Sequence, residues 1–145
     1  MKRKYYFVIF FLVLAIFLSG CSGTAPVIPS DDEANVKSVI YEYFLAVSYQ
    51  DWSEAKSYCV YGSDRYYATI TMEQYINSLA QYGIVTVTAV PTIYDVSIYG
   101  SEAEVYMKVS IVVTVGGYPD TFVGYAYYYL QKVGNNWKIY APGAA

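Results

Sequence analysis

The sequence predicts an α+β fold in which three N-terminal helices pack on a curved antiparallel sheet. Up to Gly83, apolar residues recur at helical spacing behind helix-capping motifs; after Gly83 they alternate with a period of two. Helices that precede a run of strands in the chain indicate the α+β class. Because one face of such a sheet is apolar, we expect it to curl around the amphipathic helices.

Three N-terminal helices are expected before Gly83. The motifs Ser30-Asp31-Asp32-Glu33 and Asp51-Trp52-Ser53-Glu54 are capping boxes. Thr71-Met72-Glu73-Gln74 is expected to cap the third helix, and Gly83 is well placed to end it. The segment 63–70, which contains Tyr66, Tyr67 and Ala68, is compatible with a short strand or with an irregular segment. The expected helices cover about 31–49, 51–59 and 71–82.

Four strands are expected after Gly83, joined by tight turns into an antiparallel meander. Pro91 is expected to interrupt the first strand, as at a bulge or a sheet edge. Glycine-containing turns are expected at 100–101, 116–120 and 134–136. The expected strands cover 85–99, 103–115, 122–133 and 137–140, so that 31–141 form a single domain.

The first twenty residues have the organisation of an export signal. The basic residues 2–4 precede an apolar run from Tyr5 to Leu18, which is shorter than the roughly 20 residues that span a bilayer core. The run ends in Leu18-Ser19-Gly20-Cys21, which resembles a bacterial lipobox, the signal for lipidation of its cysteine. An uncleaved membrane anchor, or an ordinary secretory signal with a chance cysteine, is the alternative.

This resemblance implies a signal peptide at 1–20 and lipidation of Cys21. A diacylglyceryl thioether with a further acyl chain such as palmitate would hold the protein at the extracytoplasmic face of the cell membrane. Ser22 is not aspartate, which by resemblance to lipoproteins of diderm cells allows export to an outer membrane. Most residues of 21–30 are Ser, Gly, Thr, Ala or Pro, and we expect a short flexible tether.

Composition excludes several classes of function. Beyond residue 20 the chain holds six basic and twelve acidic residues, which argues against nucleic-acid binding. The chain has no histidine, so nucleophile systems that need an imidazole and most zinc sites are excluded. Cys59 has no partner once Cys21 is lipidated, and we expect it to be a small buried side chain. No metal or cofactor is expected.

Three segments together resemble the nuclear transport factor 2-like superfamily, which has a cystatin-like α+β cone. They are Val39-Ile40-Tyr41-Glu42-Tyr43-Phe44-Leu45-Ala46, Asp51-Trp52-Ser53-Glu54-Ala55, and Leu130 to Ile139 with its Gly134-Asn135-Asn136-Trp137-Lys138-Ile139 ending. The resemblance covers nearly all of 31–140. It implies a pocket between the helices and the concave sheet face, and frequent homodimers through the outer sheet face. It implies no single activity, because members include isomerases, dehydratases and binding modules.

An enzyme of this superfamily would need a pocket carboxylate as base and a tyrosine that stabilises an enolate oxygen. Asp64 and Asp95 are weak candidates for the base, and Asp120 reads as a solvated turn residue. The candidate donors are Tyr41, Tyr43 and Tyr58. No carboxylate stands in a recognisable catalytic pattern, and the pocket histidine typical of dehydratases is absent.

The twenty tyrosines are the most informative residues of the chain. If Leu130 faces the helices, Tyr125, Tyr127 and Tyr129 form a ladder on the outer sheet face beside Tyr106, where they suggest an interface. A register shifted by one residue would instead place the ladder in the pocket, and a third interpretation is simple sheet cover. Trp52 and Trp137 are expected in the core. The residues suggested for a pocket are Trp52, Tyr58, Tyr67 and Tyr128.

We therefore expect a lipid-anchored, non-enzymatic module of the cell envelope that binds a small molecule or a protein. The alternative is a small-molecule isomerase or lyase that uses a pocket carboxylate and a tyrosine. A carboxylate buried in the cone, with a raised pKa and a tyrosine hydroxyl in reach, would favour the enzyme. The sequence identifies neither the ligand nor the partner.

Overall fold

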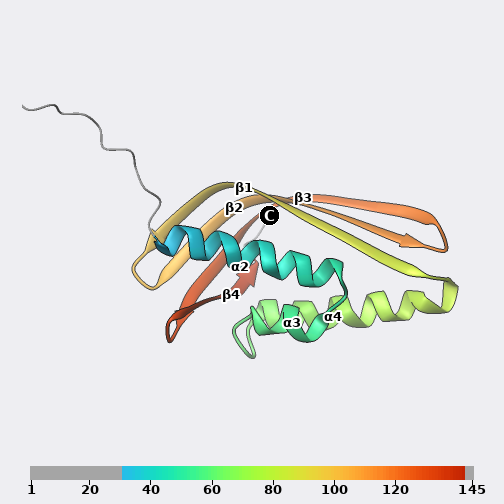
Figure 1. Ribbon diagram of the computed structural model, residues 1–145, viewed down its shortest axis with the longest axis horizontal. Coiled ribbons are helices and arrows are strands. Elements are labelled where there is room, and N and C mark those ends of the chain that lie inside the picture. The colour runs from blue at the N-terminus through green and yellow to red at the C-terminus, as the bar shows by residue number, and fades with distance from the viewer. Residues whose placement is uncertain (1–30, 143–145) are drawn as a thin grey trace, which may run out of the picture.

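The computed structural model describes residues 31–142 and shows helices followed by one antiparallel sheet (Figure 1). The leader 1–20, Cys21, the tether and the Ser30 cap lie outside the described residues. Among the described residues, no helix has the length and apolar character needed to cross a membrane. The elements are α2 (Asp31–Ser48), α3 (Trp52–Ser57), α4 (Asp64–Leu79), the 3-10 helix η1 (Ala80–Tyr82), β1 (Val85–Tyr99), β2 (Glu102–Val115), β3 (Tyr118–Val133) and β4 (Asn136–Pro142).

The four strands pair in the order β1-β2-β3-β4. The pairs β1–β2 and β2–β3 run along nearly the whole length of their strands. By contrast, β4 pairs only with Tyr128–Val133 of β3. In Figure 1 the β2–β3 hairpin accordingly extends beyond β4 on the side where α4 lies. The first ten residues of β3 therefore have a strand neighbour, β2, on one side and none among the described residues on the other.

The core lies between the helices and the inner face of the sheet. In β2 the odd-numbered residues face inward, and Val105 and Met107 are fully buried. Leu130 of β3 pairs with Ala103 of β2 and is also fully buried, so the even-numbered residues of β3 share this face. The described core residues lie within 31–142, so a chain that begins at Ser22 keeps all described contacts.

The third helix begins earlier than the sequence predicts. The expectation of a strand or irregular segment at 63–70 is wrong, because α4 starts at Asp64, where the Ser63 side chain accepts a hydrogen bond from the Tyr66 amide. Thr71 does not cap a helix; its hydroxyl donates to the Tyr67 carbonyl one turn earlier. Aromatic and β-branched residues favour strands, but here packing of the helix against the core decides its conformation.

The sheet keeps the predicted order of strands but differs in detail. Pro91 lies inside a continuous β1, paired with Val109, which is possible because β1 is an edge strand and needs no outward N–H. The irregularity falls instead between Ile93 and Asp95, where Tyr94 is the extra residue. The turn before β3 is confined to Gly116 and Gly117, both with positive φ, so β3 starts at Tyr118 and not near residue 122.

Candidate functional site

A cleft of about 590 Å³ opens between α4 and the inner face of the β2–β3 hairpin. Its volume is within the range of about 300–1,000 Å³ that small-molecule sites occupy. Thr121, Val123 and Tyr125 of β3 line the cleft too, although they alternate with the residues of β3 that face inward. The cleft therefore reaches the free edge of β3. Its inward lining comprises Arg65, Met72, Val109, Ile111, Phe122, Gly124, Ala126 and Tyr128.

Arg65 is the charged residue of this lining, and it is 94% buried, with 6% of its surface exposed. It stands on α4 one turn before Thr69, and Met72 and Ile76 continue the same helical face. Because α4 packs this face toward the sheet, the guanidinium lies inside the molecule at the inner wall of the cleft. Burial of a cation costs several kcal/mol unless other groups compensate for the lost hydration.

Aromatic rings provide part of that compensation. The guanidinium carbon lies 4.7 Å from the ring centre of Tyr43 and 4.9 Å from that of Tyr128, both within the range of cation–π attraction. The Nη2 atom of Arg65 also donates a hydrogen bond of 2.8 Å to the Tyr43 hydroxyl. Desolvation favours the neutral guanidine, but Tyr43, Tyr128 and Cys59 outweigh it and the pKa of Arg65 is raised, so the side chain remains a cation.

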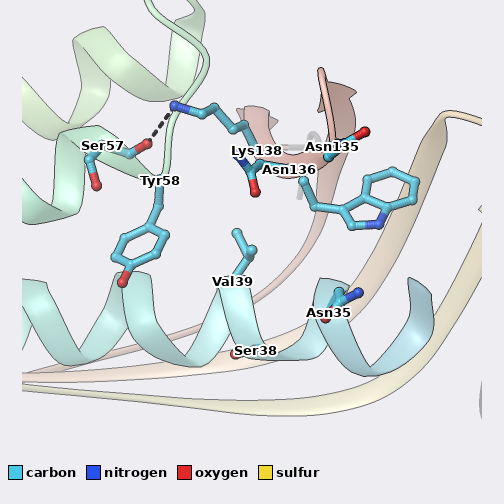
Figure 2. A pocket seen from close by; sticks show the side chains of 9 residues that line it. Asn35, Ser38, Val39, Ser57, Tyr58, Asn135, Asn136 and Lys138 are labelled. Carbon is cyan, nitrogen blue, oxygen red and sulfur yellow. Dashed lines mark hydrogen bonds between the residues drawn. The ribbon is translucent and has the colours of Figure 1, made fainter. Parts of the chain in front are cut away.

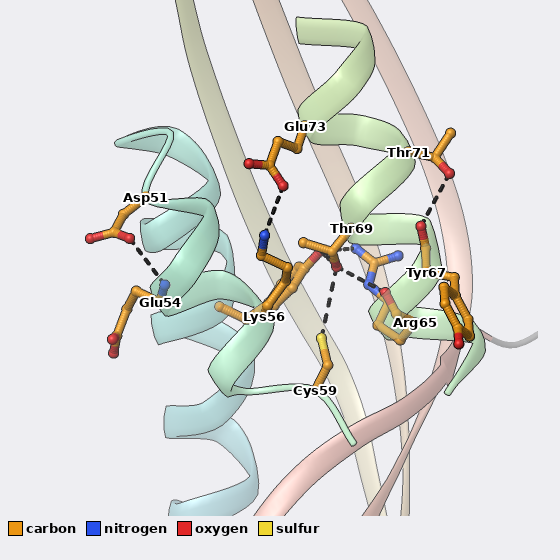
Figure 3. A network of polar contacts seen from close by, with 10 residues as sticks. Asp51, Glu54, Lys56, Cys59, Arg65, Tyr67, Thr69, Thr71 and Glu73 are labelled. Carbon is orange, nitrogen blue, oxygen red and sulfur yellow. Dashed lines mark hydrogen bonds and ion pairs between the residues drawn. The ribbon is translucent and has the colours of Figure 1, made fainter. Parts of the chain in front are cut away.

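A closed chain of hydrogen bonds fixes these groups. The Thr69 hydroxyl donates to the Arg65 carbonyl at 2.8 Å (Figure 3). Its proton is thereby used, so the Thr69 hydroxyl accepts from the Tyr43 hydroxyl at 3.0 Å. Cys59 is buried, as expected, and its Sγ lies 3.8 Å from the Thr69 hydroxyl oxygen. Burial raises the pKa of the Cys59 thiol. The Tyr43 hydroxyl thus accepts from Arg65 and donates to Thr69. Tyr43 is fully buried and has no free proton to offer a substrate.

Donors of Arg65 remain unused. A guanidinium has five N–H groups, and the hydrogen bond to Tyr43 is the one that its side chain makes with the described residues. The buried Nε has no hydrogen-bond partner there. None of the described ion pairs involves Arg65 either. Leaving such a donor unpaired in the interior costs about 1–3 kcal/mol, so residues 31–142 by themselves do not satisfy all the donors of this site.

No carboxylate of the described chain is buried in the cone; its buried polar residues are Arg65 and Thr69. Asp64 is exposed in the first turn of α4, and Asp120 is exposed beside the turn that precedes β3. Asp95 is exposed on the outer face, opposite Tyr106, and accepts a hydrogen bond from Ser97. The structure therefore brings none of these three sequence-predicted carboxylates into the cleft.

Tyr58 lies in a different groove, of about 450 Å³, between α2, α3 and β4 (Figure 2). Asn35, Asn136 and Lys138 are among its other lining residues, and Lys138 Nζ donates to the Ser57 carbonyl at 2.9 Å. Burial and a hydrogen bond with Glu54 raise the pKa of Tyr58 to about 12. The lining is half-buried or exposed polar groups apart from Val39 and the buried Trp137, and it holds no buried unpaired charge.

The four residues suggested for a pocket do not meet in one site. Tyr128 lines the cleft of Arg65, whereas Tyr58 lines the separate groove. Trp52 and Trp137 are both buried in the core, with 8% and 3% of their surface exposed, and Tyr67 is exposed on α4. Tyr41, a suggested donor, is exposed on α2. Sequence reasoning found one wall of the cleft through Tyr128 but missed Arg65.

Tyrosines gather on the outer face of the sheet, opposite the helices. The ring of Tyr106 lies 5.0 Å from that of Tyr127 and 6.5 Å from that of Tyr125, and Tyr94 stacks on Tyr125 at 6.2 Å. Tyr129 lies apart from these rings, against Tyr140 at 6.1 Å. The ladder therefore occupies the outer face of the sheet with its rings half exposed, and Tyr125, at the free edge of β3, also reaches the rim of the cleft.

Comparison with known proteins gives likeness of fold without close sequence relatives. No family model matches the chain, and no curated protein sequence matches it. Among solved structures, a conserved protein from Planctomyces limnophilus is 17% identical, with a TM-score of 0.63 over 78% of this chain and 94% of that one. A candidate dehydratase of the NTF2-like family from Streptomyces avermitilis is 14% identical, with a TM-score of 0.63 over 79% of this chain and 96% of that one.

A candidate scytalone dehydratase from Novosphingobium aromaticivorans is also similar, at 13% identity and a TM-score of 0.59 over 77% of this chain and 81% of that one. Likeness at these identities concerns the fold and not the activity. Helices followed by a curved four-stranded antiparallel sheet are what these proteins share with the chain. The protein therefore has the nuclear transport factor 2-like fold that its sequence predicts.

Proposed function

We propose that this protein is a lipid-anchored, non-enzymatic binding module of the cell envelope that holds a small molecule in the cleft between α4 and the β2–β3 hairpin. The observation that carries the proposal is the content of the cleft. Its charged group is the buried cation of Arg65, and no carboxylate lies there among the described residues. A guanidinium recognises anions but does not serve as a general base, because it stays protonated.

The alternative enzyme would need other groups in this place. A base that removes a proton next to a carbonyl must lie within hydrogen-bond reach of the substrate. Asp64, Asp95 and Asp120 are exposed outside the cleft, and the Tyr43 hydroxyl is already paired. The candidate dehydratases among the structural neighbours are compatible with a ligand-binding fold or an enzyme, and the residues of this cleft favour binding.

The anchor is tested by substituting its cysteine. In the source organism, Cys21→Ser should abolish both palmitate labelling and retention of the protein in the membrane fraction, because the thioether forms on that thiol. Ser22→Ala, the neighbouring change, should leave both unchanged. A Cys21→Ser protein that still carries lipid would contradict the lipobox interpretation.

The cleft is tested by native mass spectrometry of the protein purified from the envelope and released from its anchor. We expect a constant extra mass of small-molecule size. The matched variant is Gly124→Leu, because Gly124 faces the cleft from β3 and a Cβ there meets no atom within 4 Å. The larger side chain should fill the cleft and abolish the extra mass.

The control variant changes the opposite face of the same hairpin. Ser110 lies on the outer face of β2, paired with Val123, so Ser110→Leu adds the same side chain without entering the cleft. It should retain the extra mass. A wild-type protein that carries no extra mass, or one whose extra mass survives Gly124→Leu, would contradict binding in this cleft.

A further inference from the structure

We propose that the ligand of the cleft is a carboxylate with an apolar body, and that Arg65 is the residue that recognises its charge. This inference rests on the proposed function and specifies the chemistry of the ligand. Arg65 is a built feature of the interior: it is 94% buried, it lines the cleft, and it is placed by α4 between two aromatic rings.

An anion is what the unused donors of Arg65 require. The described residues supply one hydrogen-bond acceptor to the side chain, the Tyr43 hydroxyl, and leave the buried Nε without a partner. Carboxylates match the planar fork of a guanidinium and form two parallel hydrogen bonds with it. A carboxylate that enters the cleft can therefore pair the donors and neutralise the charge that no described acidic residue meets.

The single charge indicates a monoanion. Arg65 is the one ionic side chain among the residues that line the cleft, so a doubly charged group such as a phosphate monoester would remain half neutralised. Burial of an uncompensated charge is unfavourable on either partner. A carboxylate leaves the occupied cleft neutral, whereas a neutral ligand leaves Arg65 unpaired.

The rest of the lining indicates an apolar body. Met72, Ile111, Phe122 and Ala126 present hydrocarbon or ring surface between Arg65 and the distal part of the hairpin. With the carboxylate at Arg65 and Tyr128, the body of the ligand would follow these side chains toward the free edge of β3. The cleft thus has a cation at one end and an apolar wall along its length, and an alkyl or aryl carboxylic acid matches both.

The test measures binding of decanoate and of its neutral counterpart decanol to the chain from Ser22 to Ala145 by calorimetry. Wild-type protein should bind decanoate at least tenfold more tightly than decanol. Arg65→Met should remove that preference, because the variant keeps the apolar wall but has no charge to pair with a carboxylate. Arg65→Lys should bind decanoate with intermediate affinity, since it keeps the charge but loses the fork.

Equal affinities of wild-type protein for decanoate and decanol would overturn the proposal while leaving an apolar binding cleft in place. A preference for decanoate that survives in folded Arg65→Met would overturn it as well. If Arg65→Met does not fold, as judged by circular dichroism, the wild-type comparison with methyl decanoate decides, because the ester differs only in charge and a methyl group. Binding of neither compound would overturn the proposal, and the Gly124→Leu comparison separately decides whether the cleft holds any ligand.

Discussion

Asp32 and Arg65 differ in whether the described residues give them a partner of opposite charge. Asp32, at the start of α2, has its partners in the structure: Lys132 Nζ lies 2.8 Å from one carboxylate oxygen, and the indole N–H of Trp137 donates to the same oxygen at 3.1 Å. Arg65 is far more buried and yet has no acidic partner among the described residues. The first arrangement ties a helix to the last hairpin, and the second is the arrangement of a binding group.

The Asp32 contacts predict a dependence of stability on pH. The hydrogen bonds from Lys132 and Trp137 hold the pKa of Asp32 below its usual value in the folded state. A lowered folded pKa means that this stabilisation is complete above the unfolded pKa of about 3.9 and is lost as the pH falls through the folded value. Asp32→Asn should therefore lower the free energy of unfolding at pH 7, and the difference from wild type should shrink below about pH 4.

Urea denaturation of both proteins across this pH range measures the difference. The control is Asp31→Asn, one position earlier on the exposed side of α2, which should lower the stability less. A difference between Asp32→Asn and wild type that is the same at pH 3 and pH 7 would contradict the role of the ionised carboxylate.

Arg65 shows what residue patterns could and could not predict. Beyond residue 20 it is the single arginine of the sequence, and Arg65, Thr69, Met72 and Ile76 lie at the spacing of one helical face. This spacing places Arg65 on the inner face of a helix, but the interpretation of 63–70 as a strand or irregular segment excludes that helix. Its distance to Tyr43, on another helix, depends on tertiary packing that no local pattern specifies.

At the level of elements, the two halves of β3 have different roles: one contributes to the core and the other borders the cleft. Its second half, from Tyr128, lies between β2 and β4 and contributes Leu130 to the core. Among the described strands its first half pairs with β2 alone, so its inner side and free edge remain open to the cleft. The shortness of β4, seven residues, thus leaves room for a ligand.

The strands were more predictable than the third helix. Strict alternation in β2 and β3 set which residues face inward, and the burial of Leu130 agrees with that register. In α4 the apolar face is interrupted by Arg65 and Thr69, and its first turns are rich in residues that favour strands. The Ser63 cap is the local signal that would have placed its start correctly.

At the scale of the whole molecule, the two faces of the sheet have different surroundings. The inner face carries the core and the cleft. The outer face carries the cluster of Tyr94, Tyr106, Tyr125 and Tyr127, which no described element covers. We propose that this cluster forms a homodimer interface, because half-exposed aromatic rings grouped on one face are typical of protein interfaces.

The dimer proposal is checked by sedimentation velocity of the chain from Ser22 to Ala145. Tyr125→Glu places a charge in the centre of the cluster and should raise the dimer dissociation constant at least tenfold. Tyr61→Glu is the control, because Tyr61 is 86% exposed in the α3–α4 connection and belongs to no part of the sheet. A monomeric wild-type protein, or equal effects of the two variants, would contradict the proposed interface.

The most direct test of the binding site is the nitrogen–hydrogen correlation spectrum of the arginine side chain. Because Arg65 is the single arginine after residue 20, the Nε–H signal of the chain from Ser22 to Ala145 needs no assignment. Titration with decanoate should shift this signal and slow its exchange with water, since the carboxylate pairs the Nε that the protein leaves free. An Arg65 Nε–H signal that keeps its position during the titration would contradict recognition of an anion by Arg65. This holds whether or not the backbone amide signals of β3 shift.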